Sequence, residues 1–445
     1  MNTAESFNAR SFAGNAGFID QGQLSAFVAS GGSFGVGNVW EPFAFSLSDN
    51  EVLLQNFLFG ELTWVEAAWS SVPVLSWQHM VLGDPLATAR IIEDSLDAVW
   101  RGTNSEQGQP GDGIFWSDER NWNRNGVVDV SPEVGDRFVF PAQVASPTIV
   151  LDTDAIVESA SFESDYSLSG STLVVRSGVI DTSEGVNVQL QTDVFAGNGV
   201  RKRGPGTLIV NGLSSGIVVE AGTLAGDGLI QGLYIQGGAS LAPGDGMGVL
   251  EVEGPYSQTE SATLQVEVAG LQTAGVDFDQ FKIDGPAAVA GTLDVTRQGF
   301  PITETIGEFE SVVLLTASRV DGRFSSLVFD DVATELVTTT EESSRHNGGS
   351  DVFHTITYFD EAVTLSTYRT IVGDTDGDLD VDSADLTTIV QSWTGALSPG
   401  AGDKTWVDGD FDADGDVDAA DTTESLTSWT GAAAQQAQLV YDAAT

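Results

Sequence analysis

The aspartates towards the end of the chain repeat with a spacing that suits a cation site. Six of them recur at a constant offset, 36 residues from Asp374 to Asp410. Calcium takes about six to eight oxygen ligands, which a twelve-residue loop supplies from positions 1, 3, 5, 7, 9 and 12. We therefore predict two calcium sites. Their residues are Asp374, Asp376, Asp378, Asp380, Asp382 and Asp385, and then Asp410, Asp412, Asp414, Asp416, Asp418 and Asp421.

The two predicted loops differ at position 6, where such loops need glycine for a sharp turn. Gly415 occupies this position in the second loop, and Leu379 occupies it in the first. A side chain in the left-handed conformation costs about 1–2 kcal/mol. We therefore expect the second loop to bind calcium more strongly. The alternative interpretation is an acidic, solvated and disordered tail, because blocks of like charge are often disordered.

An apolar pattern with helical spacing follows each loop, which a disordered tail does not require. In the first copy it comprises Leu386, Ile389, Val390 and Trp393, and in the second mainly Leu426 and Trp429. The tetrapeptide Trp-Thr-Gly-Ala also recurs, at 393–396 and at 429–432. The pattern predicts a duplicated unit of one loop and one helix. We expect metal binding to induce its folding, since crowded carboxylates repel one another without a cation.

Two Asp-rich loops, each followed by one helix, resemble the dockerin module by which secreted bacterial proteins bind cohesin domains. The resemblance implies that loop positions 10 and 11 face the partner, and these are Ser383, Ala384, Ala419 and Ala420. The partner it implies is a cohesin-like domain or another cell-surface component. These small residues differ from the pairs usual in the family, and a purely structural role remains open.

Composition excludes several classes of function. The 445 residues carry a formal charge of -48, which argues against binding to nucleic acid or to an anionic membrane. There is no cysteine, so a disulfide framework and a thiol nucleophile are both excluded. No apolar run is long enough to predict a membrane span.

We predict a multidomain, mainly β protein. Helix-spaced and strand-like segments alternate up to about residue 95, including a capping box at Thr63 and Glu66. Short alternating segments separated by Gly, Asp, Ser and Pro follow, which predicts β structure. The expected domains are an α/β fragment at 1–95, a linker at 96–112, a β-solenoid with a sandwich-like closing unit at 113–370, the small α-helical calcium module at 371–433 and a tail at 434–445.

The predicted solenoid, centred on 200–255, resembles the autotransporter-associated β-strand repeat. Its signature lies in the segments 200–210, 217–224 and 241–245, and an opening with Trp116 and Trp122 precedes them. The resemblance implies an extracellular β-helix. The two tryptophans could stack on sugar rings, but a place in the core is the commoner one for Trp in a strand-rich domain.

The segments 23–27, 35–42 and 75–86 resemble the final third of a secreted bacterial family related to gingipain and caspase-like peptidases. The Cys and His of that family belong to an earlier part that has no counterpart here, so we do not transfer peptidase activity. Met1 is followed by the polar stretch 2–10 instead of a signal peptide. We expect this start to be internal to a longer secreted protein.

We predict a secreted or cell-surface β-solenoid protein that carries a calcium-binding, dockerin-like docking module, with no evident catalytic constellation. One alternative is an enzyme or other component of polysaccharide catabolism, with a polysaccharide as partner. Its two carboxyls would need a separation of about 5–10 Å. Another alternative is the remnant of a cysteine peptidase.

Overall fold

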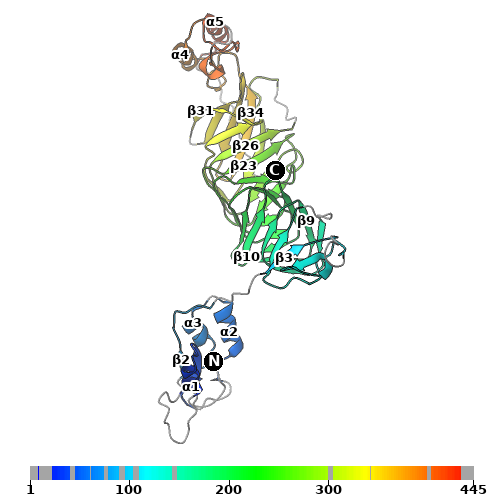
Figure 1. Ribbon diagram of the computed structural model, residues 1–445. Coiled ribbons are helices and arrows are strands. Elements are labelled where there is room, and N and C mark those ends of the chain that lie inside the picture. Colours follow the sequence, from blue (N-terminus) through cyan, green and yellow to red (C-terminus); the bar gives the residue numbers. More distant parts are fainter. Residues whose placement is uncertain are drawn as a thin grey trace. The chain divides into compact units, whose positions relative to one another are not determined.

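A computed structural model describes most of the chain. The described residues are 9, 23–40, 46–60, 62–74, 79–89, 96–103, 110–142, 148–298, 304–340, 342–397 and 402–431, so the predicted tail at 434–445 lies outside them. The chain divides into two compact units, Met1–Asp94 and Ser95–Thr445. The protein is mainly β, as predicted, and its large sheets are rich in parallel strands (Figure 1).

The first unit contains the helices and strands that local patterns predict. They are α1 (Gln23–Ala29), β1 (Gly35–Asn38), α2 (Asn50–Leu58), α3 (Trp64–Ser70) and β2 (His79–Leu82). The carboxylate of Glu66 accepts hydrogen bonds from the backbone N and the hydroxyl of Thr63, which confirms the predicted start of α3. Strands β1 and β2 pair antiparallel, and Phe57 and Trp64 pack in the core beside them.

The second unit begins with strand β3 (Asp97–Trp100), which corrects the prediction of a linker at 96–112. Strand β3 pairs antiparallel with β4 (Trp122–Arg124) and parallel with β6 (Arg137–Phe140). Strand β4 also pairs antiparallel with β5 (Val127–Val128). Trp100 is completely buried against Trp122. The Gly- and Pro-rich composition that indicated a linker begins only after this strand.

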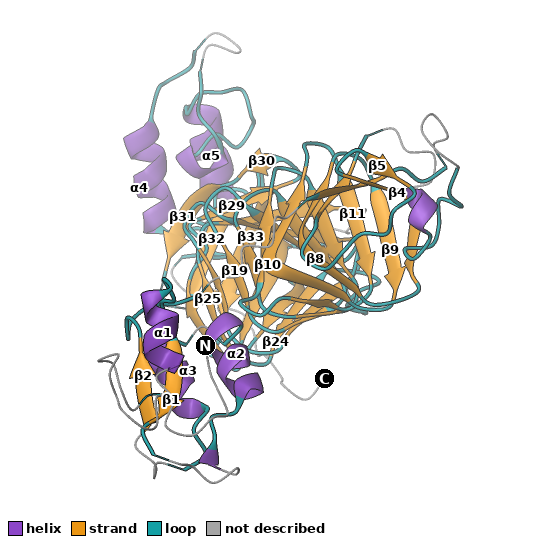
Figure 2. Cartoon of the chain, turned by 60° about the horizontal axis from the view of Figure 1, so that its bottom comes forward, coloured by secondary structure: helices purple, strands orange, loops and turns teal. Residues whose placement is uncertain are grey.

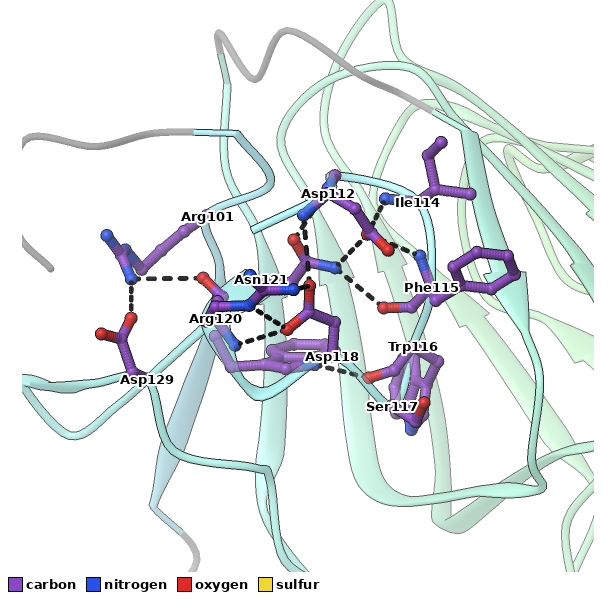
Figure 3. Close-up of polar contacts among 12 residues, drawn as sticks. Arg101, Asp112, Ile114, Phe115, Trp116, Ser117, Asp118, Arg120, Asn121 and Asp129 are labelled. Carbon is purple, nitrogen blue, oxygen red and sulfur yellow. Dashed lines mark hydrogen bonds and ion pairs between the residues drawn. The ribbon is translucent and has the colours of Figure 1, made fainter. Parts of the chain in front are cut away.

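Asn121 organises the loop that covers this edge of the second unit (Figure 3). Its side-chain oxygen accepts from the backbone N of Gly113 at 2.8 Å, and its amide donates to Asp112 and to the carbonyl of Phe115. Asn121 ends the short helix η2 (Glu119–Asn121) that leads into β4.

Trp116 and Trp122 are 6% and 0% exposed, so they belong to the core and offer no face to a sugar.

Most of the second unit consists of three columns of stacked parallel strands. The first contains β6, β8 (Ala155–Phe162), β10 (Leu173–Thr182), β13 (Val200–Arg203), β16 (Ile217–Val219), β19 (Leu233–Ile235), β22 (Tyr256–Gln258), β25 (Pro286–Val289) and β28 (Arg319–Gly322). The second shares β8 and β10 and adds β12 (Val194–Phe195), β15 (Leu213–Ser214), β18 (Leu229–Ile230), β21 (Val249–Val252), β24 (Gln280–Ile283) and β27 (Glu310–Thr316). The third contains β7 (Thr148–Leu151), β9 (Tyr166–Gly170), β11 (Asn187–Gln191), β14 (Thr207–Val210), β17 (Thr223–Gly226), β20 (Ser240–Pro243), β23 (Thr263–Val268), β26 (Thr292–Arg297) and β29 (Ser326–Phe329).

A ladder of leucines in the third column shows why the chain coils in this way. Successive coils place leucine on leucine, each at most 1% exposed, at Leu208, Leu224, Leu241, Leu264, Leu293 and Leu327. Strands such as β19 and β23 alternate buried and more exposed residues, and the buried side chains of the three columns share one core. A strand that cannot bury its apolar face alone is stabilised by stacking on its neighbours.

Parallel stacking extends beyond the predicted segment 200–255 and replaces much of the predicted sandwich-like closing unit. It includes β6 near one end and β29 near the other. Antiparallel pairing joins β3, β4 and β5 near the start of the unit. It takes over again near the end, where β29 pairs with β30 (Val332–Ala333) and a meander follows. The meander contains β31 (Glu335–Thr339), β32 (Ser343–Asn347), β33 (Val352–Tyr358) and β34 (Ala362–Arg369), and β34 pairs with β27.

Two helices, α4 (Ser383–Ser392) and α5 (Ala419–Thr427), lie side by side after the meander (Figure 2). The short helix η3 (Trp406–Asp408) lies between them in the chain. Their core is continuous with the meander, since Phe353 and Tyr368 pack in one cluster with Ile389, Trp406 and Val417. Within the described part of the chain, every helix is too short or too polar to cross a membrane.

Candidate metal centre

Helix capping fixes two aspartates of each loop. In the first loop the Asp382 side chain accepts from the backbone N of Ala384, and Asp385 accepts from the backbone N of Asp382 at 2.8 Å. Asp418 and Asp421 cap α5 in the same way. Aspartate suits both positions because a carboxylate satisfies free amides at the positive end of a helix. Loop positions 9 and 12 are thereby held in place.

The first aspartate of each loop organises the turn from inside. The Asp374 carboxylate accepts from the backbone N of Gly377 at 2.6 Å and of Leu379 at 2.8 Å. In the second loop Asp410 accepts from the backbone N of Asp414 at 3.2 Å and of Gly415 at 2.9 Å. The backbone therefore curls around this carboxylate in both loops.

The last aspartate of each loop closes it. Asp385 accepts from the backbone N of Thr375 at 2.7 Å, and Asp421 accepts from the backbone N of Phe411 at 2.8 Å. Each is at most 1% exposed. These bonds bring position 12 beside position 1, as a loop that encloses an ion requires.

The carboxylates gather in two groups in each loop, with ligand oxygens within 4.8 Å of one another. The groups are Asp374, Asp376 and Asp385; Asp380, Asp382 and Asp385; Asp410, Asp412 and Asp421; and Asp416, Asp418 and Asp421. Ten of the twelve predicted residues are therefore brought together. Asp378 and Asp414, at position 5, are outside these groups, and each accepts from the backbone two residues on.

Position 7 departs from the expected pattern, in which its backbone carbonyl is the ligand. The side chains of Asp380 and Asp416 instead approach those at positions 9 and 12. Asp416 is 3% exposed, and within the described residues its Oδ1 has no hydrogen-bond partner. Burying a carboxylate oxygen without compensation is costly, so this atom is a candidate ligand for a cation.

The electrostatics of the groups favour a bound cation. Burial raises the pKa of Asp374 to about 7 and that of Asp376 to about 6, where repulsion from Asp378 and Asp385 adds to the effect. Desolvation and repulsion from Asp421 also raise the pKa of Asp412. A divalent ion would supply the opposite charge that stabilises the ionised forms. All these donors are hard oxygens, which suits calcium.

The turn geometry changes the predicted ranking of the two loops. Leu379 has the left-handed φ of 72° that position 6 demands, and Gly415 has 89° in the second loop. At position 4, however, the second loop has Ala413 with φ 61° where the first has Gly377 with φ 69°. Each loop thus holds one non-glycine residue in a strained conformation. Backbone strain no longer gives a reason to call the second loop stronger.

The residues that the dockerin resemblance assigns to a partner all lie at the surface. Ser383 and Ala384 begin α4, Ala419 and Ala420 begin α5, and all four are exposed. The predicted packing of the helices is only partly correct. Ile389 is buried, but Val390, Trp393, Leu426 and Trp429 are 71%, 50%, 55% and 46% exposed.

The module core instead uses residues that the helix pattern did not indicate. Trp406 and Phe411 pack edge to face, and Trp406 donates its indole N–H to the carbonyl of Asp374 at 2.8 Å. Phe411 lies inside the second loop, between Asp410 and Asp412. Its apolar side chain in an otherwise acidic run was the available signal.

Arg345 on β32 is a further residue of the site that sequence reasoning missed. It donates to the carbonyl of Asp376 at 2.7 Å, and its guanidinium is 3.9 Å from the carboxylate of the same residue. The first loop therefore contacts the meander directly. Comparison with known proteins adds nothing to this geometry, since no family model matches the chain and no curated protein is significantly similar to it.

Proposed function

We propose that the two aspartate loops bind calcium and that the segment 371–433 is a calcium-dependent, dockerin-like module on a secreted or cell-surface β-solenoid protein. The observation that carries the calcium proposal is the convergence of buried carboxylates in both loops, each closed by its position-12 aspartate. Clusters of this kind are destabilised by their own charge unless an ion compensates it.

Calorimetric titration of the full chain with calcium tests this function. We expect two ions per chain. Asp376→Asn and Asp412→Asn should each weaken one site, because each removes a ligand charge and neither residue caps a helix. Glu253→Gln is the matched control, since it removes one exposed charge from the solenoid. A folded chain that takes up no calcium at millimolar concentration would refute the proposal.

The docking role rests on a separate observation. The exposed first turns of α4 and α5 present Ser383 and Ala384 on one helix, and Ala419 and Ala420 on the other. Small side chains leave the backbone there open to a partner.

A recombinant cohesin domain is the probe for this role. We expect the full chain to retain it in calcium and to release it in EDTA. The double variant Ala384→Arg, Ala420→Arg should abolish retention without affecting calcium uptake. Equal retention by the variant would refute docking through these turns.

A further inference from the structure

Val381 and Val417, at position 8 of the two loops, are each held by the opposite half of the module. The backbone N of Val381 donates to the hydroxyl of Thr430 at 2.7 Å, and its carbonyl accepts from the backbone N of Thr430 and of Gly431, both at 3.2 Å. Both valines are completely buried.

Val417 repeats this arrangement in the other direction. Its backbone N donates to the hydroxyl of Thr394 at 2.9 Å, and its carbonyl accepts from Thr394 at 3.0 Å and from Gly395 at 3.1 Å. The recurrence of Thr-Gly in both copies thus has a structural reason. The threonine supplies a hydroxyl and an amide, and Gly395 and Gly431 adopt left-handed φ values of 69° and 70° that glycine takes without strain.

These contacts join the loops crosswise through the helices. Thr430 follows α5, whose first turn holds Asp418 and Asp421 of the second loop. It is bonded to Val381, which lies between Asp380 and Asp382 of the first loop. Thr394 follows α4, which begins at the first loop, and is bonded to the second loop at Val417. Each loop is therefore tied to the far end of the helix that starts at the other.

From this reciprocal clamp we propose that the two loops bind calcium with positive cooperativity. This inference rests on the proposed calcium binding. An ion in the first loop orders Val381 and its neighbours, and the bonds to Thr430 then hold α5 in register. The aspartates at the start of α5 are thereby ordered before a second ion arrives. Binding of the second ion then requires a smaller loss of conformational entropy in the second loop, so this ion binds more tightly.

The test is a calcium titration of the full chain by calorimetry, fitted with two sites. In the unchanged chain we expect the second ion to bind at least about fivefold more tightly than independent sites allow. In the double variant Thr394→Val, Thr430→Val both ions should still bind, but the first ion should strengthen binding of the second by less than about twofold. Valine keeps the shape and the backbone amides but removes both hydroxyls. Thr394→Ser, Thr430→Ser should restore the coupling.

Thr387→Val, Thr423→Val is the matched control, because these threonines lie exposed on α4 and α5 and bond only within their own helix. It should retain the full coupling. Two ions that bind independently in the unchanged chain, or coupling that survives in the Thr394→Val, Thr430→Val variant, would overturn the clamp and leave calcium binding intact. A chain that binds no calcium would overturn both proposals.

Discussion

The phenolic O–H of Tyr368, in the last strand of the meander, donates a hydrogen bond to the backbone carbonyl of Gly377 in the first aspartate loop, at 2.5 Å. Gly377 itself lies so close to Phe353 that a Cβ at this position would clash with the ring. Together with the bond from Arg345 to Asp376, these contacts seat the loop on the sheet. The module and the meander therefore share part of their stability.

Removal of the Tyr368 hydroxyl tests this shared stability. In Tyr368→Phe the buried carbonyl of Gly377 loses its partner, which should destabilise the chain by about 1–3 kcal/mol in urea unfolding. Tyr234→Phe is the control, because Tyr234 is 38% exposed on the solenoid and its change should stay within about 0.5 kcal/mol. Equal stability of the two variants would show that the loop is not anchored through Tyr368.

The strained position 4 of the second loop gives a second prediction. Ala413 is exposed and has φ 61°, so Ala413→Gly relieves strain with little loss of packing. We expect a gain of about 1 kcal/mol in stability and tighter calcium binding in that loop. Ala420→Gly, on the first turn of α5, should instead cost about 0.5–1 kcal/mol. A loss of stability in Ala413→Gly would mean that the observed backbone angle is not a source of strain.

Sequence patterns predict what local chemistry determines. The start of α3 follows from Thr63 and Glu66, and ten of the twelve repeated aspartates gather in the groups described above, because caps and loop turns act over a few residues. Parallel pairing does not follow, since alternation with period two is the same in parallel and antiparallel strands. This explains why the stack of strands was predicted too short.

The contacts that seat the site are long-range, and the sequence carries no local sign of them. Arg345 precedes Asp376 by 31 residues and lies on another element. The ladder from Leu208 to Leu224 could be recognised as a repeat, but strand β3 has no such repeat. Its Trp100 is identified as core only by the partner Trp122, which a distant segment supplies.

A buried lysine gives a third prediction. Lys202 is completely buried in the solenoid, and its ammonium donates to the carbonyls of Arg203, Gly204 and Ala221 at 2.7–2.9 Å. Lys202→Met should leave these turn carbonyls without a partner and cost about 3 kcal/mol or more, at about 1–3 kcal/mol for each unsatisfied group.

Lys282→Met is the matched control for this substitution. Lys282 lies exposed on strand β24 of the same stack, so its change should stay within about 0.5 kcal/mol. Thermal unfolding of both variants in EDTA excludes a contribution from calcium. Similar melting temperatures for the two variants would show that the three carbonyls do not depend on Lys202.

Two buried histidines of the meander predict how stability depends on pH. Burial lowers the pKa of His354 to about 3, with further lowering by Arg297 and His346, and burial lowers that of His346 to about 4. In the unfolded chain both histidines have a pKa of about 6.5. Between these values the unfolded state binds more protons, so stability is lost as the pH falls below about 6.5, by up to about 1.4 kcal/mol per pH unit for each histidine.

His346→Gln isolates one of these contributions, because glutamine can still bond the hydroxyls of Thr334 and Ser344 that contact the ring. Urea unfolding of both proteins at pH 7.5 and pH 5.0 provides the measurement. The carboxylates titrate alike in both proteins and cancel in the difference. We expect the variant to lose about 1–2 kcal/mol less than the unchanged chain on acidification. An equal loss in both proteins would mean that His346 is protonated in the folded state, and the burial of its ring would then not exclude the charge.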